Sequence, residues 1–246
     1  MEKVRLVSKE VGYMYIKEDV MFKCFFSYYG SKAKIAKYYP SPKYGKIIEP
    51  FCGAANYSVI HFENDVLLTD LNEDVIGTWN YLKNATESDI LGLPKFSAGL
   101  DIRTLSLSED ERRFCGWWVN RGSRSPCNIV SKFAMGNSNG AEYFENVKRN
   151  VASNLYRIKH WKVELRDYST IENEKATWFI DPPYTKGGEH YIKNTIDYNH
   201  LAEFSKTRDG RVIVCENENG KWMDFRPLVS NTGVKSTLKE VIYFQD

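Results

Sequence analysis

The sequence predicts an α/β fold: a doubly wound, mostly parallel sheet interrupted by a mainly helical insertion. Between residues 46 and 83, short apolar runs that end in turn-forming residues alternate with helical patterns. This alternation is typical of parallel strands joined by helices, and it returns after residue 160. Between these stretches, residues 84–160 carry irregular helical patterns and a polar run rich in Ser, Asn and Gly over 122–140.

The chain is therefore expected to have three parts. An α/β domain is predicted over residues 22–83 and 161–246, with the insertion over 84–160. Residues 1–21 alternate loosely between apolar and charged, which predicts an N-terminal extension with a short hairpin around Val11-Gly12. Met21 is an alternative start.

The α/β domain is expected to begin as strand, glycine turn, helix, strand, acidic residue and helix. The second of these helices has apolar residues at 71, 75, 76, 79 and 82, an amphipathic spacing. The expected elements before the insertion are a helix over 33–39, a strand over 46–49, a helix over 56–62, a strand over 65–69 and a helix over 71–83. After the insertion they are strands over 161–165, 176–180, 211–216 and 239–245, and a helix over 195–206.

The composition is that of a globular protein and does not indicate a particular binding partner. Hydrophobic residues make up 42% and charged residues 27% of the 246 residues, as in ordinary globular proteins. The five cysteines lack CxxC spacing and the four histidines are scattered, so we expect neither a disulfide framework nor a metal site. The sequence contains no candidate signal peptide and no apolar run of membrane-spanning length. These features predict a cytoplasmic protein, a monomer or weak dimer, with no membrane partner and no obligate protein partner.

The basic charge is concentrated in the insertion. Between Arg103 and Lys162 there are 11 Lys and Arg residues against 5 acids, a balance of +6 (11 − 5), although the whole chain carries only +2. Lys and Arg neutralise phosphates in nucleic-acid interfaces, so this segment is a candidate DNA-binding surface. The alternative is a solvated charged face. The candidate DNA contacts are Arg112, Arg113, Arg121, Arg124 and Lys132.

Asp181-Pro182-Pro183-Tyr184 follows the apolar run of a predicted strand, at the sheet edge where open parallel sheets bind ligands. Two prolines fix φ and remove two backbone donors, which makes a stiff loop between an acid and an aromatic ring. An exocyclic amine on a purine needs such groups, because its lone pair is delocalised into the ring. The Asp181 carboxylate and the Pro182 carbonyl would accept its N–H hydrogen bonds, and Tyr184 would stack on the base.

Two further segments follow predicted strands. Small residues within Glu49–Ala55 let the chain turn tightly and approach a ligand. Asp70 ends the next strand, where an acid commonly binds ribose hydroxyls. The alternative for Asp70 is the N-cap of the helix predicted from Leu71.

From about Phe26 to the C-terminus, the order of these motifs resembles the D12-class (Dam-like) family of N6-adenine-specific DNA methyltransferases. The matching motifs are Tyr28–Lys32, Ile48–Ala54, Thr69–Asn72, Arg166–Tyr168 and Ile180–Tyr184. The resemblance implies a Rossmann-like methyltransferase sheet that binds S-adenosyl-L-methionine without a metal. It implies cofactor contacts from Tyr28, Lys32, Glu49, Phe51, Gly53, Asp70, Asp167 and Asp181, and catalysis by Asp181, Pro182, Pro183 and Tyr184.

The family also implies double-stranded DNA as partner, a flipped adenine as target, and a role such as restriction-modification in a bacterial or phage-infected cell. Within the insertion, Val119–Arg121 and Ser131–Gly136 resemble a diverged target-recognition region. Ala55 stands where the family usually has a second glycine, which narrows the cofactor loop by one methyl group. The alternatives are an N4-cytosine DNA methyltransferase, RNA as substrate, and a catalytically impaired DNA-binding homologue.

Overall fold

The computed structural model describes residues 22, 24–135, 140–188, 195–228 and 240–246. The hairpin predicted within residues 1–21 lies outside the described residues, as does part of the polar run predicted over 122–140. Of the helices in the described residues, none combines the length and the apolar character that crossing a membrane requires.

The sheet has seven strands in the order β3-β2-β1-β4-β5-β7-β6. The first five strands of this order run parallel, and β7 pairs antiparallel with both β5 and β6. The predicted mostly parallel α/β sheet is thus confirmed. The strands are β1 (Lys46–Glu49), β2 (Asp65–Asp70), β3 (Lys162–Leu165), β4 (Ala176–Ile180), β5 (Gly210–Asn217), β6 (Arg226–Pro227) and β7 (Glu240–Gln245).

The helices before the segment 84–160 are η1 (Ala36–Tyr38), α1 (Asn56–Ile60) and α2 (Glu73–Asn84). Those of the segment 84–160 are α3 (Glu87–Leu91), η2 (Ile102–Thr104), α4 (Glu109–Val119), α5 (Lys132–Met135), α6 (Gly140–Ala152) and η3 (Leu155–Ile158). η4 (Tyr168–Thr170) and α7 (Tyr198–Lys206) follow.

Most expected elements are present, with ends set by local hydrogen bonds. α2 begins two residues later than predicted because the Asn72 side chain caps it, accepting from the Asp74 N–H. α7 begins at Tyr198 because the Asp197 side chain accepts from the N–H groups of Asn199 and His200. The predicted helix over 33–39 is only one turn of 3-10 helix, and the short edge strand β6 was not predicted.

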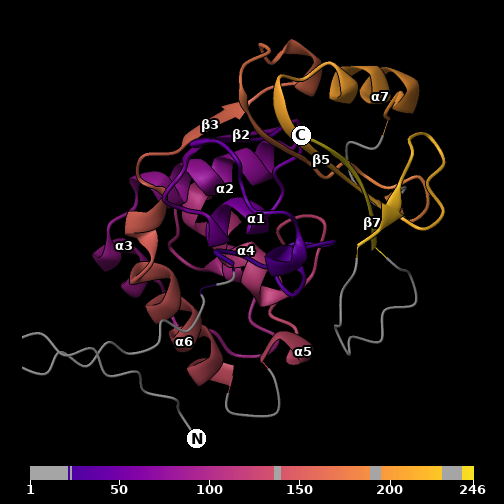
Figure 1. The fold of residues 1–246 in the computed structure, drawn as a ribbon. Coiled ribbons are helices and arrows are strands. Elements are labelled where there is room, and N and C mark those ends of the chain that lie inside the picture. The colour runs from indigo at the N-terminus through magenta and orange to yellow at the C-terminus, as the bar shows by residue number, and fades with distance from the viewer. Residues whose placement is uncertain (1–21, 23, 136–139, 189–194, 229–239) are drawn as a thin grey trace, which may run out of the picture.

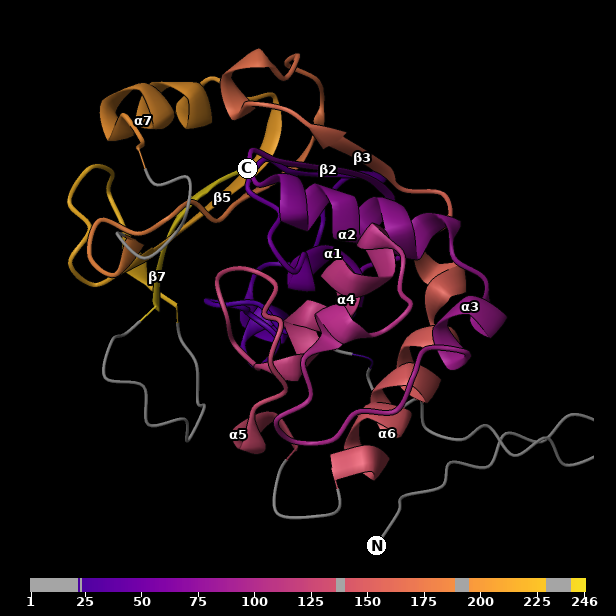
Figure 2. The ribbon, with the colours of Figure 1, turned by 180° about the vertical axis from the view of Figure 1, so that it is seen from behind.

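Alternate residues of the central strands face two separate cores. Ile48, Trp178 and Val212 pack with Leu201 and Phe204 of α7 on one face. The neighbouring strand residues pack against α1, α2 and the segment 84–160 on the other face. Figure 1 shows α7 on one side of the sheet and α1, α2 and α4 on the other, and Figure 2 shows the same layers from behind.

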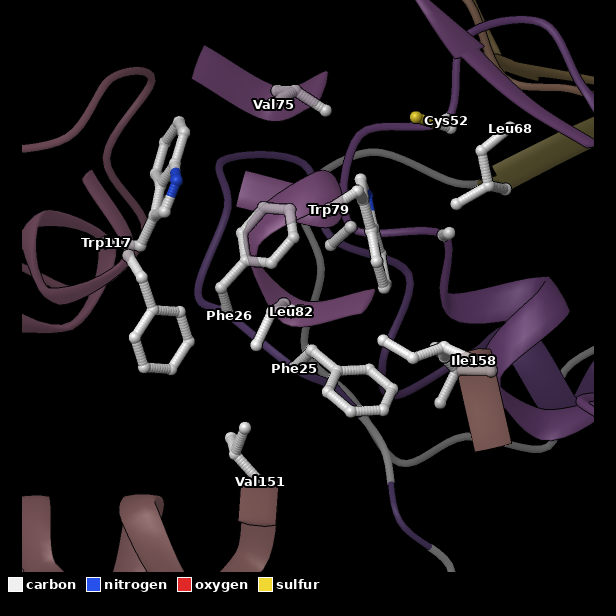
Figure 3. Close-up of a cluster of buried hydrophobic side chains, with 14 of the residues drawn as sticks. Phe25, Phe26, Cys52, Leu68, Val75, Trp79, Leu82, Trp117, Val151 and Ile158 are labelled. Carbon is white, nitrogen blue, oxygen red and sulfur yellow. The ribbon is translucent and has the colours of Figure 1, made fainter. Parts of the chain in front are cut away.

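The segment 84–160 shares the second core with the sheet. Figure 3 shows Phe26 between Trp79 of α2 and Trp117 of α4, with ring centroids 5.3 and 5.5 Å from its own. The Trp117 indole N–H also donates to the Thr78 hydroxyl of α2 at 2.8 Å. The helices of this segment therefore pack into the same hydrophobic cluster as α2. Their described residues do not form a separate core of their own.

Candidate active site at the carboxyl edge of the sheet

The strand order reverses between β1 and β4. The chain runs outward from β1 to β2 and β3, and then crosses to β4 and β5 on the other side of β1. Crevices at such a switch point, outside the carboxyl ends of the strands, are where open α/β sheets bind ligands. A cavity of about 300 Å³ lies there, lined by residues that follow β1, β2 and β4.

All eight residues predicted to bind a cofactor line this cavity. Of the four predicted catalytic residues, Asp181 and Pro183 are part of the lining, whereas Pro182 and Tyr184 are not. The eight are Tyr28, Lys32, Glu49, Phe51, Gly53, Asp70, Asp167 and Asp181. The fold thus gathers residues from five separate sequence motifs around one space.

The glycine loop, residues 49–55, turns with two residues in the left-handed region. Gly53 has φ of 43°, and a Cβ there would lie 3.0 Å from the Tyr28 ring. Ala55 has φ of 44°, a conformation that costs a residue with a Cβ about 1–2 kcal/mol. The Trp79 indole N–H donates to the Gly53 carbonyl at 2.9 Å, which fixes the loop to α2.

Asp70 bridges the glycine loop and the start of α2. Its carboxylate accepts the N–H of Gly53 at 3.1 Å and the N–H of Asn72 at 2.9 Å. The N-cap of α2 is Asn72, so the alternative interpretation of Asp70 as the cap is wrong. Burial raises the pKa of Asp70 to about 6, against the lowering effect of the backbone N–H bonds.

Glu49 is the most deeply buried acid of the cavity lining, at 2% exposure. Its carboxyl accepts the N–H of Ser58 at 2.8 Å, in the first turn of α1. Burial raises the pKa of Glu49 to about 8, although the Ser58 hydrogen bonds oppose the shift. Glu49 is therefore mainly neutral at pH 7, which its position in the sequence did not indicate.

Asp181, directly after β4, is paired with a lysine from the other end of the chain. The Lys32 ammonium lies 2.9 Å from one Asp181 carboxylate oxygen and 2.8 Å from the other. The same ammonium lies 4.7 Å from the centroid of the Tyr184 ring. The positive charge of Lys32 thus contacts both the acid and the aromatic ring of the predicted catalytic motif.

The Asp181–Tyr184 loop is also held by hydrogen bonds to three side chains that were not predicted as site residues. The Tyr198 hydroxyl of α7 donates to the Pro183 carbonyl at 2.8 Å. The fully buried Glu216 of β5 accepts the N–H of Thr185 at 3.1 Å. The Tyr184 hydroxyl donates to Glu240 of β7 at 2.6 Å. In the sequence, the only indication of a role for Glu216 is that it is an acid at the end of a predicted strand.

Asp181, Cys215 and Glu240 form the only group of three potential metal ligands found among the described residues, with donor atoms within 4.8 Å of one another. Their donor atoms are already engaged: Lys32 binds Asp181, and two tyrosine hydroxyls donate to Glu240. Burial raises the pKa of the Cys215 thiol, which disfavours the thiolate that a metal needs. This group is better described as a hydrogen-bonded and ion-paired network.

The predicted DNA contacts differ in what their side chains already bind. The Arg113 guanidinium pairs with Asp74, Glu109 and Asp110, and it packs against Gly77 of α2. Arg112 donates to the Leu107 carbonyl at 2.9 Å. These contacts connect α4 to α2 and to the turn before α4, so both side chains serve the fold.

The other three candidates lie on the loop after α4 and on α5. Arg121 donates to the Phe133 carbonyl at 2.8 Å and lies against the rings of Phe133 and Tyr143. Arg124 is exposed, with its guanidinium 5.4 Å from the Tyr29 ring centroid, and Lys132 at the start of α5 is also exposed.

The loop that carries Arg121 and Arg124 is joined to the N-terminal motif beside the cavity. The Tyr29 N–H donates to the Ser123 carbonyl at 3.0 Å. The Gly122 N–H donates to the Ser27 hydroxyl at 2.8 Å. Because Tyr28 and Tyr29 line the cavity, this part of the basic segment lies next to the candidate active site.

Most of the remaining basic residues of the segment cap or cover other groups. Lys148, 3% exposed, donates to the carbonyls of Leu91 and Leu93 after α3. Lys159 donates to the carbonyls of Lys83 and Ala85 at the end of α2. Part of the charge excess of the sequence thus satisfies carbonyls at the C-termini of α2 and α3.

No match was found among curated proteins. A family model does match part of the chain, and the matched part contains the glycine loop, Lys32 and Asp70 but ends before Asp181. The predicted resemblance is confirmed over this range: residues 28–102 match the family of D12 class N6 adenine-specific DNA methyltransferases.

Proposed function

We propose that this protein transfers the methyl group of S-adenosyl-L-methionine to the exocyclic N6 amine of adenine in double-stranded DNA. One observation carries the proposal: Asp181 lines the same cavity as the glycine loop and Asp70, which lie in the range matched by the methyltransferase family. A cofactor and a target amine would therefore meet at the end of β4.

The residues of the cavity fit this cofactor. Close approach to the backbone is possible at Gly53, where a Cβ would fill the space in front of Tyr28. The Asp70 carboxylate uses one acceptor site on each oxygen for a backbone N–H, which leaves acceptor capacity for ribose hydroxyls. Phe51 and Tyr168, whose rings lie 5.2 Å apart, supply apolar surface beside Asp167 for a purine ring.

The bound cofactor would supply an activated sulfonium methyl group, so the protein mainly has to orient the nucleophile. The Asp181 carboxylate accepts one N–H of the amine beside its bonds to Lys32. The Pro183 carbonyl already accepts a hydrogen bond from the Tyr198 hydroxyl. The Pro182 carbonyl is therefore the proposed acceptor for the second N–H of the amine. The bound cofactor would supply the methyl group to the amine nitrogen and leave as the neutral thioether, and Asp181 is the proposed acceptor of the proton that the methylated amine would lose.

The segment 84–160 is the proposed target-recognition region. The support is local: Arg121 and Arg124 lie on a loop that is hydrogen-bonded to the cavity-lining residue Tyr29 and to Ser27, and Lys132 is exposed nearby in the chain. Arg112 and Arg113 are left out of the proposed interface because their guanidinium groups hold α4 in place. An adenine would have to flip out of the duplex to reach Asp181.

The direct test is mass spectrometry of nucleosides after unmethylated plasmid DNA is incubated with the protein and labelled cofactor. We expect N6-methyladenine from the unmodified protein. Asp181→Ala should lower turnover at least about 1,000-fold, because the carboxylate that orients the amine is lost, while cofactor binding stays measurable. Asp224→Ala, which changes an exposed acid outside the cavity, is the matched control and should be fully active.

Other products would separate the alternatives. N4-methylcytosine would assign the same chemistry to a different base, and methylated RNA alone would change the substrate. No product with intact DNA binding would indicate an impaired homologue. Full turnover by Asp181→Ala would remove the proposed catalytic role of that residue.

A further inference from the structure

Tyr184 of the Asp181–Tyr184 loop belongs to a hydrogen-bonded group with Glu240 and Tyr39. Oε1 of Glu240 accepts the hydroxyl of Tyr184 at 2.6 Å and the hydroxyl of Tyr39 at 2.6 Å. Glu240 belongs to β7, the antiparallel strand, and Tyr39 follows η1. One carboxyl oxygen thus joins two tyrosines from segments about 145 residues apart in the chain.

The bond to Glu240 fixes the ring of Tyr184. Burial raises the pKa of Tyr184 well above its ordinary value, so its hydroxyl stays protonated and acts as a donor. A buried hydroxyl without a partner is costly, so the ring is held in the orientation that reaches Glu240. The Pro183 carbonyl is fixed separately by Tyr198, which leaves Glu240 to set the side chain that follows.

The ring of Tyr184 in turn contacts the Lys32 ammonium. This ammonium is 4.7 Å from the ring centroid and within 2.9 Å of both Asp181 oxygens. Contacts therefore run without interruption from Glu240 through Tyr184 and Lys32 to Asp181. If Tyr184 rotates, the Lys32 ammonium loses its contact with the ring, which weakens one of the contacts that fix its position against the Asp181 carboxylate.

We infer that Glu240 is a positioning residue for methyl transfer, which acts through the Tyr184 hydroxyl to hold Lys32 and the Asp181 carboxylate toward the target amine. This inference rests on the proposed function. Glu240 does not itself line the cavity, so it is expected to affect the transfer step more than cofactor binding.

The test is a double-mutant cycle on the full chain, with kcat, KM and cofactor affinity measured separately. Glu240→Leu removes the acceptor, and Tyr184→Phe removes the donor while keeping the ring. Each should lower kcat about 10- to 100-fold, the cost of a misplacement near 1 Å, with cofactor affinity within about 2-fold of the unmodified protein. The double variant should be no slower than the slower single variant, because both changes break one interaction.

Two further variants separate positioning from general stability. Glu240→Gln keeps an acceptor oxygen and should retain kcat within about 3-fold. Tyr39→Phe removes the other hydroxyl from the same oxygen, and it should lower the melting temperature without changing kcat. If Glu240→Leu does not fold, the comparison of Glu240→Gln with Tyr184→Phe decides the question.

Additive losses in the double variant, or equal kcat losses in Tyr39→Phe and Tyr184→Phe, would overturn the inference. So would an unchanged kcat in Glu240→Leu. An unmodified protein that makes no methylated base would overturn the proposed function and this inference together. Product from the unmodified protein with additive losses would overturn this inference alone.

Discussion

The carboxyl edge of the sheet and the segment 84–160 both hydrogen-bond ionisable side chains to the backbone, but these bonds serve different purposes. At the sheet edge the buried acids Glu49 and Asp70 use backbone N–H groups and still face a cavity. In the segment, Lys148 and Lys159 donate to helix-terminal carbonyls. A charge count along the sequence cannot distinguish these uses, because the distinction depends on what the fold places opposite each charge.

Because of Glu49, the free energy of unfolding should fall as pH rises from 6 to 8. Burial raises the folded-state pKa of Glu49 to about 8 from an ordinary value of 4.5. The folded state therefore binds more protons between these pH values, and stability falls as pH rises toward 8. We expect a loss of roughly 2–3 kcal/mol between pH 6 and 8, at about 1.4 kcal/mol per unit of pH, measured by urea unfolding.

Glu49→Gln is the control for this window, because an amide oxygen can still accept from Ser58 but cannot ionise. The slope of stability against pH between 6 and 8 should flatten in this variant. Asp70, whose pKa is raised to about 6, contributes in the same direction mainly below pH 6. An equally steep slope in Glu49→Gln would assign the pH dependence to other groups.

In the helical segment the largest effect should come from Lys148. Lys148→Met keeps the apolar stem but leaves the carbonyls of Leu91 and Leu93 without their donor and Glu145 without its ion pair. We expect a loss of about 2 kcal/mol in the free energy of unfolding. The salt dependence of DNA binding should stay unchanged, and a flatter dependence would assign Lys148 to the DNA interface.

Arg121 and Arg124 should behave in the opposite way. Replacing both with Gln should weaken DNA binding about 10-fold and lower the slope of log affinity against log salt by about 1.8 for two phosphate contacts. Stability should change little for Arg124, which is exposed. Titration at several salt concentrations by fluorescence anisotropy measures the slope, with Arg103→Gln as a control, since Arg103 pairs with Asp101. An unaltered slope would exclude this loop from the interface.

The difference between the residues themselves and what the fold places opposite them also explains how much the sequence could predict. Short apolar runs and helical patterns located β1, α1, β2, α2 and β4, and topology alone then brings the ends of parallel strands together. The eight cavity residues could be predicted because each stands next to a strand end or in a motif. The roles of Glu240 and Tyr198 could not, because they depend on how β7 and α7 pack beneath the Asp181–Tyr184 loop. The pairing of Arg113 with Asp74 likewise depends on how α4 packs on α2.

The smallest predicted effect concerns Ala55, where a left-handed residue carries a side chain. Ala55→Gly removes a strain of about 1–2 kcal/mol, and the greater freedom of glycine in the unfolded chain offsets about 0.5–1 kcal/mol of the gain. We expect a net stabilisation of about 0.5 kcal/mol by urea unfolding. Gly53→Ala should have the opposite sign and a larger size, because it adds strain and brings a methyl group to 3.0 Å from Tyr28. If Ala55→Gly instead destabilises the protein, the packing of its buried methyl group outweighs the backbone strain.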